Sequence, residues 1–73
     1  MSEKKTFNLQ TDSEFIELMK LLKVVQIAQT GGHAKLLIEN ELIQVNGAVE
    51  LRKRKKLRKG DLVQFEDLVI EIA

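Results

Sequence analysis

The sequence predicts an α+β fold, with two helices packed on one side of a small, mainly antiparallel sheet. Two observations lead to this prediction. Over residues 12–23 and 33–40, apolar side chains recur every three or four positions, which is the period of a helix with one buried face. Residues 42–72 change to short apolar runs separated by turn signals, which are typical of strands. Helices followed by a run of strands indicate the α+β class.

The chain begins with a polar segment and a short alternating one. Residues 1–5 are polar and are expected to be disordered. Residues 6–10 alternate polar and apolar side chains, with Phe7 and Leu9 on one face. This two-residue period predicts a half-buried strand near the N-terminus.

A first helix is expected over residues 12–23. Thr11 and Glu14 have the spacing of a capping box, in which the two side chains accept hydrogen bonds from backbone N–H groups at the helix start. The apolar stripe that follows consists of Phe15, Ile16, Leu18, Met19, Leu21 and Leu22. Its spacing predicts one buried face.

A second helix is expected from His33 to about Asn40, after a connector over residues 24–30. Gly31 and Gly32 interrupt regular structure just before it. The expected core face consists of Ala34, Leu37, Ile38 and Leu42.

Four short strands are expected in the remainder of the chain. They cover residues 42–45, 48–51, 62–66 and 68–72. Asn46 and Gly47 both tolerate positive φ, which predicts a tight hairpin turn between the first two. Gly60 and Asp61 mark a further turn before the third.

The composition excludes several kinds of protein. Seventy-three residues suit one domain, expected over residues 1–73. There is no Cys, which excludes disulfides and a thiol nucleophile. With one His and no acidic cluster at metal-ligand spacing, neither a metal nor a cofactor is expected. No apolar run approaches the roughly 18 residues of a membrane span, and no signal peptide is visible. We therefore expect a cytoplasmic protein.

Positive charge is concentrated in one segment. The chain has 12 basic and 11 acidic residues, yet seven of the basic ones lie within residues 52–59. We expect Leu57, which interrupts this run, to anchor it to the core. The density predicts a polyanionic partner, because Lys and Arg neutralise phosphates and release condensed counterions. A solvated loop and an acidic membrane surface are the alternatives, but no amphipathic helix carries the charges to a membrane.

The start of the second helix is a candidate for a second anion site. Gly31 and Gly32 allow backbone N–H groups to approach an anion, and the helix dipole disfavours Lys35 in the first turn unless an anion compensates it. Glycines that only let the chain turn tightly are an equal alternative. No nucleophile and orienting partner accompany His33, so we expect it to bind phosphate or sugar, or to face solvent, rather than to act in catalysis.

The three Phe residues are candidates for stacking against nucleic-acid bases. Phe7, Phe15 and Phe65 all fall on faces predicted to be buried, so core packing is their expected role. Proteins that bind single strands use exposed rings. Recognition of the shape and phosphates of a folded RNA is therefore favoured.

Four segments match a known family. They are Leu18 to Leu22, Gly31 to Ile38, Val45 to Gly47, and Lys59 to Val63. In this order and spacing, residues 15–65 resemble the alpha-L RNA-binding motif, the domain type named after small-subunit ribosomal protein S-four. The chain looks most like the small stand-alone members, the YbcJ-like RNA-binding proteins.

The resemblance implies an α+β domain that binds structured RNA, often ribosomal or transfer RNA. In the family, two helices and the following strand and loop form the RNA-binding face. By position, this implies contacts at the second helix and in the basic loop. Many members have Ser-Arg where this chain has Gly31 and Gly32, so backbone contacts are expected to replace an Arg side chain here.

We therefore expect a monomeric, non-enzymatic protein that binds structured RNA, on the ribosome or a ribosomal intermediate. The expected RNA-binding residues are Gly32, His33, Lys35, Arg52, Lys53, Arg54, Lys55, Lys56, Arg58 and Lys59. The alternative is an interaction adaptor whose basic loop docks on an acidic protein. Duplex DNA also stays open, because phosphate contacts carry no base information.

Overall fold

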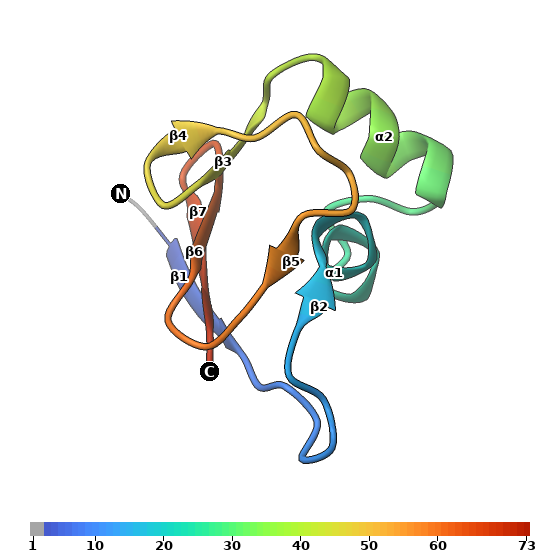
Figure 1. The fold of residues 1–73 in the computed structure, drawn as a ribbon. Coiled ribbons are helices and arrows are strands. Elements are labelled where there is room, and N and C mark those ends of the chain that lie inside the picture. The colour runs from blue at the N-terminus through green and yellow to red at the C-terminus, as the bar shows by residue number, and fades with distance from the viewer. Residues whose placement is uncertain (1–2) are drawn as a thin grey trace.

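Two helices and seven strands make up residues 3–73, the part of the chain that the computed structural model describes (Figure 1). In chain order they are β1 (Glu3–Phe7), β2 (Ile16–Glu17), α1 (Leu18–Val24), α2 (Gly31–Glu39), β3 (Ile43–Val45), β4 (Ala48–Val49), β5 (Lys56–Leu57), β6 (Leu62–Phe65) and β7 (Leu68–Ile72). Five strands form a sheet in the order β1-β7-β6-β3-β4, and β2 pairs with β5 in a separate ribbon. Only β1 and β7 pair in parallel among these strands. The predicted α+β fold is confirmed.

One face of the sheet shares a hydrophobic core with both helices and the ribbon. Strand alternation places Ile43, Val45, Val63, Ile70 and Ile72 on that face, and all five are buried. The helices and the ribbon contribute Leu18, Leu21, Leu22, Ala34, Leu37, Ile38, Ile16 and Leu57. In Figure 1 both helices lie to one side of the sheet. The opposite face of the sheet is left without a covering layer among the described residues.

The N-terminal strand begins earlier than its alternation predicts. β1 covers Glu3–Phe7 rather than residues 6–10, and it pairs in parallel with β7 at one edge of the sheet. The expected disorder of residues 1–5 is therefore wrong for the last three of them, while the first two lie outside the described residues. An edge strand keeps charged side chains in solvent, and Lys4 forms an ion pair with Glu71 at 3.1 Å.

The first helix begins later than predicted. It starts at Leu18 rather than at residue 12, because the two preceding residues pair with β5 as a strand. The predicted capping box of Thr11 and Glu14 is wrong. Glu17 is the N-cap residue, and its side chain makes no capping hydrogen bond.

The second helix begins earlier than predicted. It starts at Gly31 because Thr30 is the N-cap residue and its hydroxyl accepts a hydrogen bond from the N–H of His33 at 3.0 Å. The expected core side chains Ala34, Leu37 and Ile38 are buried. Leu42 is exposed instead, because the chain leaves the helical path at Glu41, which has a φ of 61°.

The hairpin turn is as predicted. Asn46 and Gly47 have φ values of 53° and 87°, which the two central residues of a type I′ turn require. The flanking strands β3 and β4 pair as expected, although both are shorter than their apolar runs. The last strand, β7, has the predicted bounds.

Candidate functional site

The basic segment, residues 52–59, is attached to the start of α1 by its backbone. The N–H groups of Leu18 and Met19 donate to the carbonyl oxygens of Lys55 and Lys53, both at 2.9 Å. These are two of the N–H groups that a helix start leaves without an intrahelical partner. Leu57 is fully buried, as predicted, so the segment is fixed at several points along its length.

The far end of the basic segment is fixed to the hairpin turn. Asn46 donates from Nδ2 to Asp61 Oδ1 at 3.1 Å, and its Oδ1 accepts from the N–H of Leu62 at 2.9 Å. Asp61 Oδ2 accepts from the N–H of Arg58 at 2.8 Å. Asn46 therefore has a structural role, joining two turns that are distant in sequence.

One cation of the basic segment already has an intramolecular partner. Arg52 donates to both carboxylate oxygens of Glu50, from Nε at 2.9 Å and from a terminal nitrogen at 3.2 Å. Glu50 is mostly covered, and hydrogen bonds from the Arg52 side chain hold the pKa of Glu50 below its ordinary value of 4.5. Arg52 is thus less available to a ligand than its neighbours, a difference that is not visible in the sequence.

Replacing Glu50 with Gln is expected to remove an acid-dependent part of the stability. Because the pKa of Glu50 is lower in the folded state, its interaction with Arg52 stabilises the fold above pH 4.5 and is lost as the pH falls through the folded pKa. In urea titrations, the free energy of unfolding of the parent minus that of E50Q should be constant near neutral pH and shrink below pH 4.5. A difference that grows on acidification would contradict this assignment.

The remaining cations divide into two groups. Lys53, Arg54, Lys55 and Lys59 form no ion pair or cation–π contact with any residue in the range 3–73. Lys56 and Arg58 both lie over the ring of Phe15, at 4.9 and 5.6 Å from its centroid. Phe15 was predicted to be buried; it is 36% exposed, so that prediction is wrong.

The start of α2 presents free backbone donors. Within the described chain, no hydrogen-bond acceptor meets the N–H groups of Gly31 and Gly32. Nδ1 of His33 accepts from the N–H of Gln29 at 3.2 Å, so Nε2 is the ring nitrogen left for a ligand. Lys35 approaches Glu39 only loosely, at 3.8 Å.

Met19 lies between the two candidate anion sites. Its backbone N–H is bonded to Lys53, and its Sδ is 3.9 Å from the position that a Cβ on Gly31 would occupy. Lys35 lies one helical turn after Gly31, on the same flank of α2. The contacts therefore connect the basic segment, α1 and the flank of α2 that carries Lys35.

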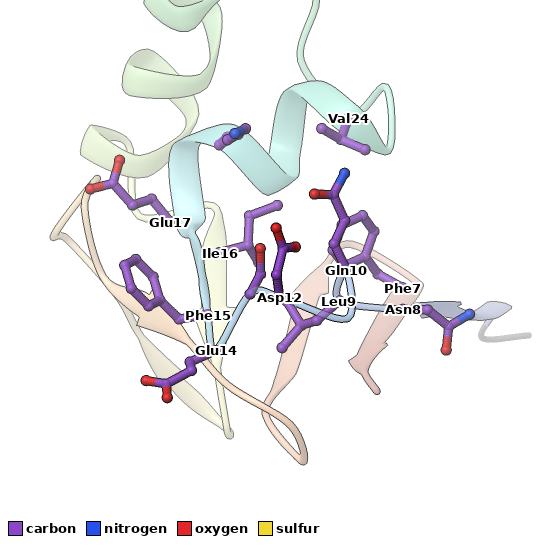
Figure 2. Close-up of a pocket in the computed structure, with 12 residues that line it drawn as sticks. Phe7, Asn8, Leu9, Gln10, Asp12, Glu14, Phe15, Ile16, Glu17 and Val24 are labelled. Carbon is purple, nitrogen blue, oxygen red and sulfur yellow. The ribbon is translucent and has the colours of Figure 1, made fainter.

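A groove of about 820 Å³ lies beside α1, and it is acidic (Figure 2). Asp12, Glu14 and Glu17 line it together with apolar side chains, and Lys20 is the one basic residue in its wall. None of the predicted RNA-binding residues lines this groove. The groove and the basic segment are therefore lined by different residues, and they adjoin at Phe15.

Two further findings concern residues 3–73. No three His, Asp or Glu side chains in this range gather closely enough to hold a metal ion. Neither helix has the length and hydropathy needed to cross a bilayer.

Comparison with protein families gives a match over most of the chain. Residues 8–73 match the model of the S4 domain. The match includes the basic segment and both helices.

Similar proteins are found in two well-known bacteria. The chain is 37% identical over 57 residues to the "Putative RNA-binding protein YbcJ" of Escherichia coli (strain K12), covering 78% of this chain and 81% of that protein. It is 34% identical over 58 residues to the "Probable ribosome maturation protein RlbA" of Bacillus subtilis (strain 168), covering 80% and 82%. The solution structure of E. coli YbcJ, described as revealing an alpha-L motif involved in RNA binding, superposes with a TM-score of 0.69 at 36% identity, over 100% of this chain and 91% of that one.

Proposed function

This chain belongs to the S4 domain family, and from that premise we propose that it is a non-enzymatic protein that binds the phosphates of structured RNA. Its relative YbcJ is named for RNA binding, and the YbcJ structure is described in the same terms. One observation carries the proposal: residues 52–59 contain several cations with no ion-pair or cation–π partner within residues 3–73, on a backbone that is bonded to α1. Such an arrangement suits a polyanion.

The basic segment binds RNA because its charges are held close together before binding. The four cations that have no ion pair or cation–π contact in the described part of the chain repel one another in the free protein. Phosphates remove that repulsion while releasing their own counterions. Arg54 can donate two parallel hydrogen bonds to one phosphate, whereas Lys53 and Lys55 act as point charges. Since Leu57 is buried, little chain entropy is lost when RNA binds.

The start of α2 provides the second phosphate contact. Gly31 and Gly32 do not need to be glycine for the fold, because neither has a positive φ and a Cβ on either would meet its nearest neighbour at 3.9 Å, an ordinary contact. The absence of side chains leaves their N–H groups open to an anion at the positive end of the helix dipole. His33 Nε2 and Lys35 then supply further donors.

The two contacts lie on one surface in this proposal. The N–H of Met19 donates to Lys53, and its Sδ lies 3.9 Å from where a Cβ on Gly31 would stand. Lys35 follows Gly31 on the same helix flank. A single stretch of folded RNA can therefore span both. Binding would fail as a two-point contact if Lys35 and Arg54 faced opposite sides of the protein.

The partner is ribosomal or transfer RNA, which the protein binds as a monomer in the cytoplasm. The relative RlbA is named for ribosome maturation, which supports an RNA of the ribosome or of a ribosomal intermediate. The acidic side chains of the groove also favour a nucleic acid on the side of the basic segment only.

The proposal predicts a steep dependence of RNA affinity on salt. If about six phosphates are contacted, the logarithm of affinity should fall against the logarithm of salt concentration with a slope of about −4 to −5. Fluorescence anisotropy with a labelled RNA hairpin measures this slope. A DNA hairpin of the same sequence is the control for RNA preference.

Two results would contradict the proposal. A slope near zero would show that phosphates are not the ligand. A partner that is captured from lysate equally well after ribonuclease treatment, and that is an acidic protein, would favour an adaptor instead.

A further inference from the structure

Phe15 projects from the outer face of the ribbon that β2 and β5 form. Ile16 pairs with Leu57, and both side chains are buried in the core. Strand residues alternate between faces, and Phe15 and Arg58 directly flank the two strands. Phe15, Lys56 and Arg58 therefore lie on the opposite, solvent-facing side, with Glu17 beside Lys56. Figure 2 shows the Phe15 ring on the other side of the strand from Ile16. The ring is therefore exposed for a structural reason and not because of a frayed end.

The two cations over the ring belong to the basic segment. Lys56 Nζ is 4.9 Å and Arg58 Cζ 5.6 Å from the ring centroid. Arg58 is more than half exposed, and its ion pair with Glu14 is long, at 4.0 Å. Both cations can therefore leave the ring for a phosphate without breaking a strong contact.

We infer that Phe15 stacks against one unpaired base of the bound RNA, while Lys56 and Arg58 contact the phosphates on either side of that base. This inference rests on the proposed function and adds an RNA feature to it. Stacking of a base on an aromatic ring is a stronger interaction than an exposed cation–π contact. Replacing a cation over the Phe15 ring with a stacked base therefore favours the complex.

The charges around Phe15 determine on which side of the ring the RNA backbone lies. Asp12, Glu14 and Glu17 line the groove beside Phe15, so they repel phosphates from that side. Lys56 and Arg58 attract phosphates to the side of the basic segment. The ring thus lies at the border between a repelling and an attracting surface, where a base can stack while its backbone stays with the cations.

Two RNA hairpins that differ by one unpaired uridine in the stem test the inference. The parent protein should bind the hairpin with the unpaired base about 5- to 150-fold more tightly than the fully paired one, the range expected for one stacked base. Phe15→Leu should abolish this preference, and Phe15→Tyr, which keeps the ring, should retain it. With 5-iodouridine at the unpaired position, irradiation should crosslink the parent protein at Phe15, as located by mass spectrometry.

The outcomes separate the inference from the proposed function. Equal preference in the parent and F15L, or a crosslink at another residue, overturns the stacking role even if both hairpins bind with a steep salt dependence. Failure of the parent to bind either hairpin overturns the proposed function itself. Thermal unfolding establishes whether F15L is folded; if it is not, F15Y and the crosslink in the parent decide the question.

Discussion

Replacing Arg54, Lys55 and Lys56 together with Ala is expected to weaken binding to structured RNA of any sequence. Losing three phosphate contacts should reduce the steepness of the salt dependence by about 2 to 3, since each contact contributes about 0.7 to 0.9. At about 0.1 M salt this corresponds to a loss of roughly 100- to 1,000-fold in affinity. Anisotropy titrations at several salt concentrations measure both quantities.

A matched variant controls for net charge. Lys4, Lys5 and Lys23 are exposed, and replacing all three with Ala removes the same charge. The first two lie in β1, at the opposite edge of the sheet from β4, which leads into the basic segment. This control variant should retain most of the RNA affinity, and the slope of its salt dependence should be close to that of the parent. Equal losses in the two variants would mean that net charge alone attracts RNA and that residues 52–59 are not the interface.

Replacing Leu57 with Ala is expected to lower the free energy of unfolding more than any other substitution proposed for this protein. Leu57 is fully buried where the ribbon meets the helices, and removal of such a side chain costs about 2–5 kcal/mol. For a chain of this length, that loss lowers the melting temperature by roughly 8 °C or more. Circular dichroism during heating and in urea measures the change.

Leu51→Ala is the control for this substitution. Leu51 precedes the basic segment in sequence but is 59% exposed, so its removal should change the free energy of unfolding by less than about 0.5 kcal/mol. If L57A and L51A unfolded at the same temperature, Leu57 would not anchor the segment, and the rigidity assigned to it would have to come from backbone hydrogen bonds alone.

Local patterns predicted the parts of the fold that local interactions determine. The core face of α2 follows from helical spacing, and the hairpin at Asn46 and Gly47 follows from the backbone freedom of those two residues. The bounds of β7 follow from a run of apolar residues that only Glu71 interrupts. Each of these elements needs only its own side chains and a core to pack against.

Long-range pairing accounts for what the sequence could not predict. The ribbon joins residues 16–17 to residues 56–57, and two-residue strands have no detectable period. Its formation delays the start of the helix expected over residues 12–23 to Leu18 and turns Phe15 outward. β1 likewise forms because it pairs with β7 at the edge of the sheet. Its charged residues show no alternation of apolar side chains that would predict a strand.

The positive charge of the candidate site was predictable from the sequence. Which of its side chains are free to contact a ligand was not. The density of cations over residues 52–59 is visible in the sequence. That Arg52 is bound to Glu50, and that Nδ1 of His33 accepts a backbone hydrogen bond, depends on side-chain geometry. The structure therefore ranks residues that the sequence could only group together.

The hydrogen bonds from α1 to Lys53 and Lys55 have a consequence for how the chain is made. During synthesis the first helix emerges well before these two carbonyls, so its initial turn stays incomplete until the later residues have been added. The event that finishes the helix is the same one that brings the positive charges into position. A nascent chain cannot present its assembled cationic surface before the tertiary structure closes, so premature capture of nucleic acid by a half-made protein is limited by the fold itself.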